Sequence, residues 1–252
     1  MTNPATLNGL RILVTRPEQR AKTFVSMLQA KGAEAMLFPA ITIIEPLNTQ
    51  SRETVLKNIS DYQMAIFISP TAVEKTLEHI DVLPQTLKLI ALGKSTARAL
   101  KALGYTLSFE AETQDSESLL AQPQMQAEQV ATQNIVIFRG EGGRPLLADT
   151  LRERGARVTY ADIYRRALPV SEHLQTTQLS GLHAVCVTSN QSLENLILLC
   201  DDAALLKTLP LFVPGHRCAD LARALGFAAV HIASSATDDA MLDALVEWAK
   251  QR

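Results

Sequence analysis

The stretch Arg11-Ile-Leu-Val-Thr-Arg-Pro-Glu18 contains the pattern that decides the fold, because a short apolar run ends there in a proline turn. Apolar residues then recur at helical spacing over residues 21–28, and Gly32-Ala33-Glu34 follows where a glycine commonly ends a helix. The order strand, turn, helix, glycine and next strand predicts a βαβ unit with parallel strands.

The same order returns later in the chain. Ile135-Val-Ile-Phe-Arg-Gly-Glu141 is another apolar run, and a helical pattern after it ends at Gly155. Two further pairs of similar segments are 65–74 with 184–194 and 97–105 with 219–227. All pairs keep the same order at an offset of roughly 120 residues, so the chain is expected to be an internal duplication of a small domain.

The strand candidates are continuous runs of Val, Ile and Leu, which is typical of parallel strands covered on both faces. In the first half these runs lie near 11–15, 34–38, 64–68, 88–92 and 106–109. We therefore predict an α/β fold with two lobes, each built on a parallel sheet. Two extended segments with prolines at their ends, 38–46 and 160–169, are expected to connect the lobes. The pattern leaves open whether each lobe is a contiguous half or the lobes exchange their first units.

Composition excludes several classes of function. The formal charge is −2, no basic cluster occurs and aromatic residues make up 5%, so nucleic acid is not an expected partner. The three cysteines are widely spaced and the five histidines lack metal-ligand spacing, so neither a disulfide framework nor a metal site is expected. No secretory signal or membrane-spanning run is evident. We expect a soluble, cytoplasmic protein that does not bind membranes.

Small hydroxyl residues and glycines follow most of the strand candidates. These loops include 69–71, 93–96, 139–143, 188–190 and 234–237. In open α/β sheets ligands bind outside the carboxyl ends of the strands, where helix N-termini favour anions. Ser, Thr and Asn are also the usual helix caps and need no ligand for that role. Since so many such loops fall on matching ends of two lobes, we expect a cleft for a small anionic molecule.

The succession of motifs resembles that of uroporphyrinogen-III synthases, and it covers nearly the whole chain. The motifs are Ile12-Leu-Val-Thr-Arg-Pro-Glu18, Phe67-Ile-Ser-Pro-Thr-Ala-Val73, Ala91-Leu-Gly-Lys-Ser-Thr-Ala97, Arg139-Gly-Glu-Gly-Gly-Arg144, Val187-Thr-Ser-Asn190 and Ala236-Thr-Asp-Asp-Ala-Met-Leu242. The resemblance implies two flavodoxin-like lobes joined by a two-stranded connector. It assigns 1–38 and 168–252 to lobe 1, 48–158 to lobe 2, and 39–47 and 159–167 to the connectors.

The resemblance also implies an activity. Such enzymes are lyases of haem biosynthesis that close the linear tetrapyrrole hydroxymethylbilane, with loss of water and inversion of ring D, and they use no cofactor or metal. The substrate-binding residues that it implies here are Arg16, Ser69, Ser95, Thr96, Ser189 and Thr237, to which we add Arg139 from the glycine-rich loop. Ser189-Asn190 departs from the Ser-Pro turn that is more usual in the family.

Tyr164 is the candidate catalytic residue. It lies in a predicted connector, where its phenol hydroxyl can assist the departing hydroxyl of the substrate. The alternative role is that of an aromatic prop in the connector. We further expect a monomer that receives hydroxymethylbilane by transient hand-over from hydroxymethylbilane synthase. The alternative to an enzyme is a two-lobed sensor that closes on an anion without chemistry.

Overall fold

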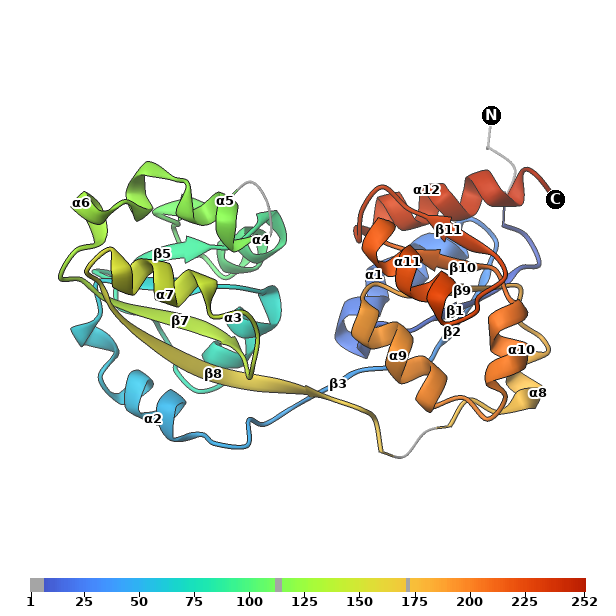
Figure 1. Cartoon of the computed structure of the whole chain (residues 1–252), viewed down its shortest axis with the longest axis horizontal. Helices are drawn as coiled ribbons and strands as arrows, with labels where there is room; N and C mark the ends of the chain where they lie inside the picture. The colour runs from blue at the N-terminus through green and yellow to red at the C-terminus, as the bar shows by residue number, and fades with distance from the viewer. Residues whose placement is uncertain (1–6, 112–114, 171–172) are drawn as a thin grey trace. The chain divides into compact units, whose positions relative to one another are not determined.

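The computed structural model describes residues 7–111, 115–170 and 173–252. The chain divides into two compact units, of which unit 1 comprises Met1–Thr42 and Ala167–Arg252, and unit 2 comprises Ile43–Arg166. The chain therefore begins in unit 1, builds unit 2 without interruption, and returns to complete unit 1 (Figure 1). The sequence left open whether each lobe is a contiguous half of the chain. In the structure the lobes are not contiguous halves, because the first βαβ segment packs with the C-terminal part of the chain in unit 1.

Unit 1 is a five-stranded sheet with helices on both faces. Its strand order is β11-β10-β9-β1-β2, and every neighbouring pair is parallel. The strands are β1 (Arg11–Val14), β2 (Glu34–Leu37), β9 (Ala184–Cys186), β10 (Leu211–Val213) and β11 (Val230–Ile232). One face is covered by α1 (Glu18–Ala30) and α12 (Asp238–Ala249). The other is covered by α8 (Thr176–Leu179), α9 (Asn190–Leu198), α10 (Ala203–Thr208) and α11 (His216–Ala224).

Unit 2 has a six-stranded sheet of order β3-β8-β7-β4-β5-β6. The strands are β3 (Thr42–Ile44), β4 (Met64–Phe67), β5 (Lys88–Ala91), β6 (Phe109–Glu110), β7 (Asn134–Gly140) and β8 (Arg157–Ala167). The helices α2 (Gln50–Lys57), α3 (Pro70–Leu77) and α4 (Lys94–Ala102) cover one face. The helices α5 (Ser116–Leu120), α6 (Ala127–Val130) and α7 (Leu146–Glu153) cover the other. Short 3₁₀ turns occur at Ile59–Asp61 and Pro123–Met125.

Burial on both faces explains why the strands read as continuous apolar runs. Successive side chains of β1 point to opposite faces, so that Ile12 and Val14 pack in one core of unit 1 and Leu13 in the other. In the same way β7 divides its side chains between the two cores of unit 2. The predicted α/β class with two parallel sheets is confirmed. Four of the five strands expected in the first half form within a residue of the expected ranges, whereas the run near 106–109 forms only the two-residue strand β6 at Phe109–Glu110.

The two units repeat one topology. In unit 1 the order β2-β1-β9-β10-β11 is the flavodoxin-like order 2-1-3-4-5. In unit 2 the order β8-β7-β4-β5-β6 is spatially the same, although β7 and β8 come last in the chain. Local geometry repeats as well: Ser69 has φ −158° and ψ 156°, and Ser189 has φ −160° and ψ 159°. The duplication read from the sequence is therefore a duplication of structure, with one copy circularly permuted.

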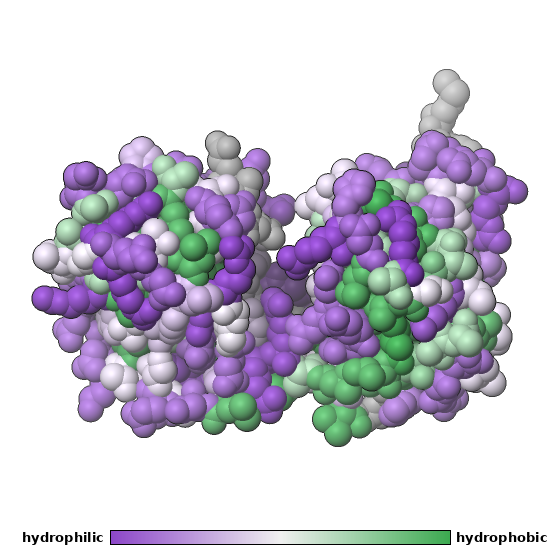
Figure 2. Space-filling model, viewed as in Figure 1, coloured by the Kyte–Doolittle hydropathy of each residue, from purple (hydrophilic) through white to green (hydrophobic). Residues whose placement is uncertain are grey.

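In the view of Figure 2 the surface of unit 2 is mainly hydrophilic, whereas unit 1 also shows hydrophobic residues over its centre and lower edge. Among the described residues of unit 1, the large apolar side chains that remain exposed are Leu37, Leu168, Val170 and Leu198. No helix in the described parts of the chain combines the length and the apolar character that crossing a bilayer requires.

Candidate active site

Each unit has a topological switch point at the carboxyl edge of its sheet. In unit 1 this point lies between β1 and β9, because α1 follows β1 onto one face and α9 follows β9 onto the other. In unit 2 it lies between β7 and β4, which lead into α7 and α3 on opposite faces. Doubly wound sheets bind ligands at such points, since the two loops diverge there and leave helix N-termini accessible.

The switch point of unit 2 brings Ser69 and Tyr164 into direct contact. Ser69 is the N-cap of α3 and its Oγ accepts a hydrogen bond from the Ala72 N–H at 3.1 Å. The same Oγ lies 3.1 Å from the phenol oxygen of Tyr164. Tyr164 stands near the end of β8, and only 2% of its surface is exposed. The phenol is thus buried at the carboxyl edge of the sheet, where its contact with Ser69 holds it in a fixed position.

The backbone next to Tyr164 is fixed by β7. The pairing of β7 with β8 shifts register between Arg139 and Gly140, so that Gly140 pairs with Tyr164. The Glu141 N–H then donates to the Tyr164 carbonyl at 2.7 Å. A bulge of this kind bends the strand locally and turns the side chains that follow.

Arg139 is engaged by two neighbours on β8. Its Nε donates to the Asp162 carboxylate at 2.8 Å, and its guanidinium carbon lies 3.4 Å from the centroid of the Tyr160 ring. Only 14% of its side chain is exposed. The charge of Arg139 is therefore largely balanced in unit 2, and its planar group is oriented by stacking.

Ser95 and Thr96 lie in the first turn of α4, after the N-cap Gly93. Thr96 is 1% exposed, and its hydroxyl donates to the Leu92 carbonyl at 3.0 Å. The Thr96 hydroxyl is thus already hydrogen-bonded within the first turn of α4. Ser95, which is half-buried, is the one of the two that is nearer to the surface.

The switch point of unit 1 is organised by Arg16, the residue that follows Thr15 after β1. The guanidinium forms an ion pair with Asp238, donates to the Ala236 carbonyl at 3.2 Å, and lies 4.8 Å from the centroid of the Phe24 ring. Asp238 is in the first turn of α12, where a carboxylate is also favoured by the helix dipole. Arg16 therefore ties the loop after β1 to the start of α12.

A buried pair of hydroxyl groups links the end of β1 to the end of β9 and to the first turn of α9. Thr15 Oγ1 donates to the Cys186 carbonyl at 2.9 Å and lies 2.9 Å from Ser192 Oγ. Both hydroxyl residues are at most 2% exposed. Cys186 is 2% exposed, and burial raises the pKa of its thiol to about 12.

Ser189 and Thr237 both act as helix N-caps. Ser189 Oγ accepts from the Ser192 N–H at 3.1 Å at the start of α9. Thr237 Oγ1 accepts from the Ala240 N–H at 3.4 Å at the start of α12, and lies 2.9 Å from Ser235 Oγ. The capping role that the sequence offered as the simple explanation is thus real for Ser69, Ser189 and Thr237.

Sequence reasoning missed the partners of these residues. Gly140, Asp162 and Asp238 contact predicted site residues, but all three come from other strands or loops. One signal was present in the sequence, because all four tyrosines of the chain fall between residues 62 and 164, within unit 2. The Ser-capped turn occurs in both units, whereas a tyrosine beside it occurs only in unit 2.

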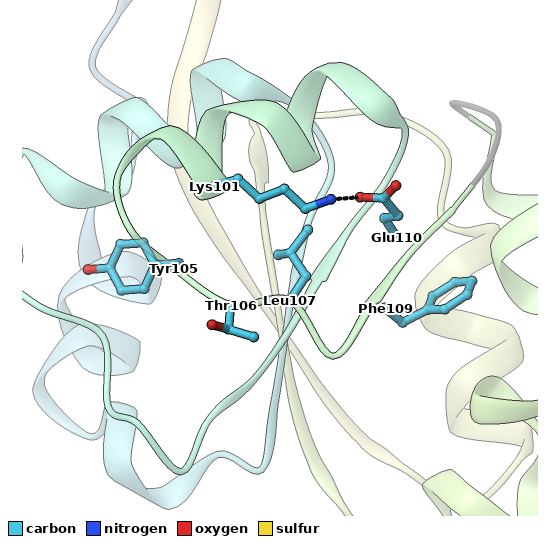
Figure 3. Close-up of a pocket in the computed structure, with 6 residues that line it drawn as sticks. All are labelled: Lys101, Tyr105, Thr106, Leu107, Phe109 and Glu110. Atoms are coloured by element: carbon cyan, nitrogen blue, oxygen red, sulfur yellow. Dashed lines mark hydrogen bonds and ion pairs between the residues drawn. The ribbon is translucent and has the colours of Figure 1, made fainter.

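The described residues contain no cluster of three or more His, Cys, Asp or Glu side chains that could hold a metal ion. A pocket of about 410 Å³ lies in unit 2 between the last turn of α4 and the edge strand β6 (Figure 3). Its lining residues are Lys101, Tyr105, Thr106, Leu107, Phe109 and Glu110. Lys101 and Glu110 form an ion pair of 2.6 Å in it. None of the predicted site residues lines this pocket.

Comparison with known proteins identifies relatives of the whole chain. The family model described as uroporphyrinogen-III synthase HemD matches residues 22–243. The uroporphyrinogen-III synthase of Escherichia coli is 32% identical over 247 residues, which cover 94% of this chain and 100% of the relative. That of Salmonella typhimurium is 30% identical over 249 residues, with the same coverage.

Solved structures support the fold. Uroporphyrinogen-III synthetase from Helicobacter pylori superposes with a TM-score of 0.63 at 14% identity, covering 95% of this chain and 99% of that one. A mutant uroporphyrinogen III synthase from Thermus thermophilus gives a TM-score of 0.58 at 19% identity, covering 96% and 99%. At these identities the likeness concerns the two-sheet α/β architecture.

Proposed function

Because the chain belongs to the uroporphyrinogen-III synthase family, we propose that it closes hydroxymethylbilane to uroporphyrinogen III with Tyr164 beside the departing hydroxyl. Family membership makes the protein a hydro-lyase of tetrapyrrole biosynthesis. The proposal concerns how this chain's own residues carry out the reaction.

The observation that carries the proposal is the contact between Tyr164 and Ser69 at the switch point of unit 2. A serine hydroxyl has one proton to donate and two acceptor sites, and the Ala72 N–H occupies one of those sites. If Ser69 donates its proton to the phenol oxygen, the proton of Tyr164 is left available for the substrate. Ser69 would then orient the phenol as a donor toward the leaving group.

Departure of the substrate hydroxyl does not require a strong acid. The hydroxyl that departs as water sits next to a pyrrole, whose nitrogen lone pair stabilises the cation that remains. The phenol would donate its proton to the departing hydroxyl, which then leaves as water, and it would regain a proton when ring closure releases the one on the attacked pyrrole carbon. The harder task is geometric, since an unguided bilane closes without inverting ring D. Most of the catalytic effect would therefore come from holding the substrate in the folded conformation that favours inversion.

The substrate's carboxylates need local partners, because a net charge of −2 gives no overall attraction. We propose that the N-terminal turns capped by Ser69, Ser189 and Thr237 supply backbone N–H donors, together with the first turn of α4 at Ser95. Thr96 would fix that turn, because its N–H donates to the Gly93 carbonyl and its hydroxyl donates to the Leu92 carbonyl. Arg16 and Arg139 are paired with Asp238 and Asp162, yet a guanidinium has five N–H donors. Each arginine can therefore hold its protein carboxylate and still donate to a substrate carboxylate.

The test is an isomer analysis of the product made from hydroxymethylbilane. The protein is expected to give mainly the type III isomer, at a rate well above that of spontaneous closure. Spontaneous closure supplies the control, since it gives type I without enzyme. A sensor protein that binds without chemistry would leave both the rate and the isomer at the spontaneous values, and that result would refute the proposal.

A further inference from the structure

We propose that Gly140 is a positioning residue, whose missing side chain is the space that the Tyr164 ring occupies. The inference rests on the proposed role of Tyr164. It adds a residue whose part in the reaction is only to fix where the phenol stands.

The contact is closer than any side chain would permit. A Cβ added at Gly140 would lie 2.8 Å from both Cε2 and Cζ of Tyr164, and 3.1 Å from its hydroxyl oxygen. Real Cβ atoms essentially never approach a neighbour closer than 3.0 Å. An alanine at this position would therefore push the end of the ring that carries the hydroxyl.

The ring cannot move away freely, because three contacts hold Tyr164. Its backbone carbonyl accepts from the Glu141 N–H at 2.7 Å, and its hydroxyl lies 3.1 Å from Ser69 Oγ. Its ring is packed within the core beneath α3 and α4, where the residue is 2% exposed. Displacement of the ring would thus lengthen or break the contact with Ser69 before it disturbed the rest of the sheet.

Space, and not backbone conformation, is what requires glycine here. Gly142 and Gly143 in the same loop have φ of 81° and 99°, in the left-handed region that favours glycine. Gly140 is outside that region, so that an alanine could adopt its backbone without strain. The demand for glycine at position 140 therefore comes from the phenol.

The duplicated unit gives an independent comparison. Val14 pairs with Cys186, three residues before the capping Ser189, just as Ile137 pairs with Ile66, three residues before the capping Ser69. By this register Arg16 in unit 1 is equivalent to Arg139 in unit 2, and Pro17 is equivalent to Gly140. Unit 1 contains no tyrosine, and there a residue with a side chain stands at this position. Only unit 2 therefore has both a glycine at this position and a tyrosine that contacts it.

The experiment is a double-mutant cycle on the full-length protein with Gly140→Ala, Tyr164→Phe and the combined variant. In the Tyr164→Phe variant the ring remains but the hydroxyl is gone. Gly140→Ala should lower kcat about 10-fold in the wild-type background, because misplacing a catalytic group by about 1 Å can cost up to 10²-fold. In the Tyr164→Phe background the same change should alter kcat by less than roughly twofold, because the two changes act through one group.

Two further measurements separate the inference from the proposed function. Tyr164→Phe alone tests whether the phenol matters, and wild-type turnover would reject the catalytic role. A crystal structure of Gly140→Ala tests the positioning itself, with the hydroxyl expected beyond hydrogen-bond distance from Ser69 Oγ. Finding that contact unchanged would overturn the inference, as would an equal loss of kcat in both backgrounds. Ile135→Val is the matched control, since it perturbs the same strand β7 in the opposite core and should retain kcat.

Discussion

At the scale of single residues, the ion pair of Arg16 with Asp238 is the contact that most clearly links two separate loops of unit 1. The Arg16 side chain is 10% exposed and that of Asp238 is 24% exposed, so screening by solvent is incomplete. Arg16→Met should lower the free energy of unfolding by about 1.5–3 kcal/mol, the usual range for hydrogen bonds to charged groups. Denaturant unfolding measures this loss. Arg16→Lys, which keeps the charge, should lose less, and equal losses for both variants would contradict this explanation.

The cysteines provide a second test at this scale. Burial raises the pKa of the Cys186 thiol to about 12 and that of Cys218 to about 11, and it also raises that of Cys200. Because the thiolate is the reactive form, all three should be alkylated slowly in the native protein at pH 8. Mass spectrometry after iodoacetamide treatment would follow this. Cys186, which is the most buried of the three, should react only after unfolding, and rapid labelling of Cys186 in the native state would contradict its core position.

The sequence named Arg16 and Ser69 from motifs and Tyr164 from its place in a predicted connector, but it did not give the partners of these three residues. Their contacts with Asp238, with each other and with Gly140 join segments that lie far apart in the chain. Such contacts depend on strand order and register, which a single sequence does not fix.

At the scale of elements, the duplicated N-caps form a matched pair. Ser69 and Ser189 have nearly the same backbone angles and accept the same capping hydrogen bond. Ser69→Ala and Ser189→Ala should therefore each lower the free energy of unfolding by about 1 kcal/mol. Only Ser69 contacts a phenol, so Ser69→Ala should also reduce turnover, though less than Tyr164→Phe does. Thermal unfolding and kinetics on both variants test this, and an equal effect on turnover would count against the role of Ser69.

The helices and strands were predictable where apolar patterns were strong. The run 160–169 was harder, because its polar residues and terminal proline suggested an extended connector. In the structure β8 extends over Arg157–Ala167 and pairs with β7 as far as Tyr164. Polar residues occur in it because part of the strand is only half-buried, so the hydrophobic pattern weakens there although the pairing continues.

At the scale of the whole molecule, the exchange of segments makes the two units unequal in folding. Unit 2 is continuous, with its own sheet and two cores. A fragment of residues 43–166 should fold alone and unfold cooperatively. A fragment of residues 167–252 should not, because it lacks β1 and β2, and β1 lies between β2 and β9 in the sheet of unit 1. Circular dichroism melts of both fragments test this, and a folded C-terminal fragment would contradict it.

Both the repeat and the parallel sheets could be inferred from sequence, because they depend on local patterns. The exchange could not be derived from those patterns, since both wirings place the same loops at the same sheet edges. It was expected only from the resemblance to a family.

The central claim is that Tyr164, oriented by Ser69, assists the leaving hydroxyl while the fold of the bound bilane directs ring inversion. Turnover and isomer ratio of a folded Tyr164→Phe variant with hydroxymethylbilane test it most directly. Activity should fall by about 10²-fold or somewhat less, near the lower end for a positioned acid, and the remaining product should still be type III. Wild-type turnover would contradict the catalytic role and leave Tyr164 as an aromatic prop, whereas a change to type I product would contradict the division of tasks, because the phenol would then be steering ring D.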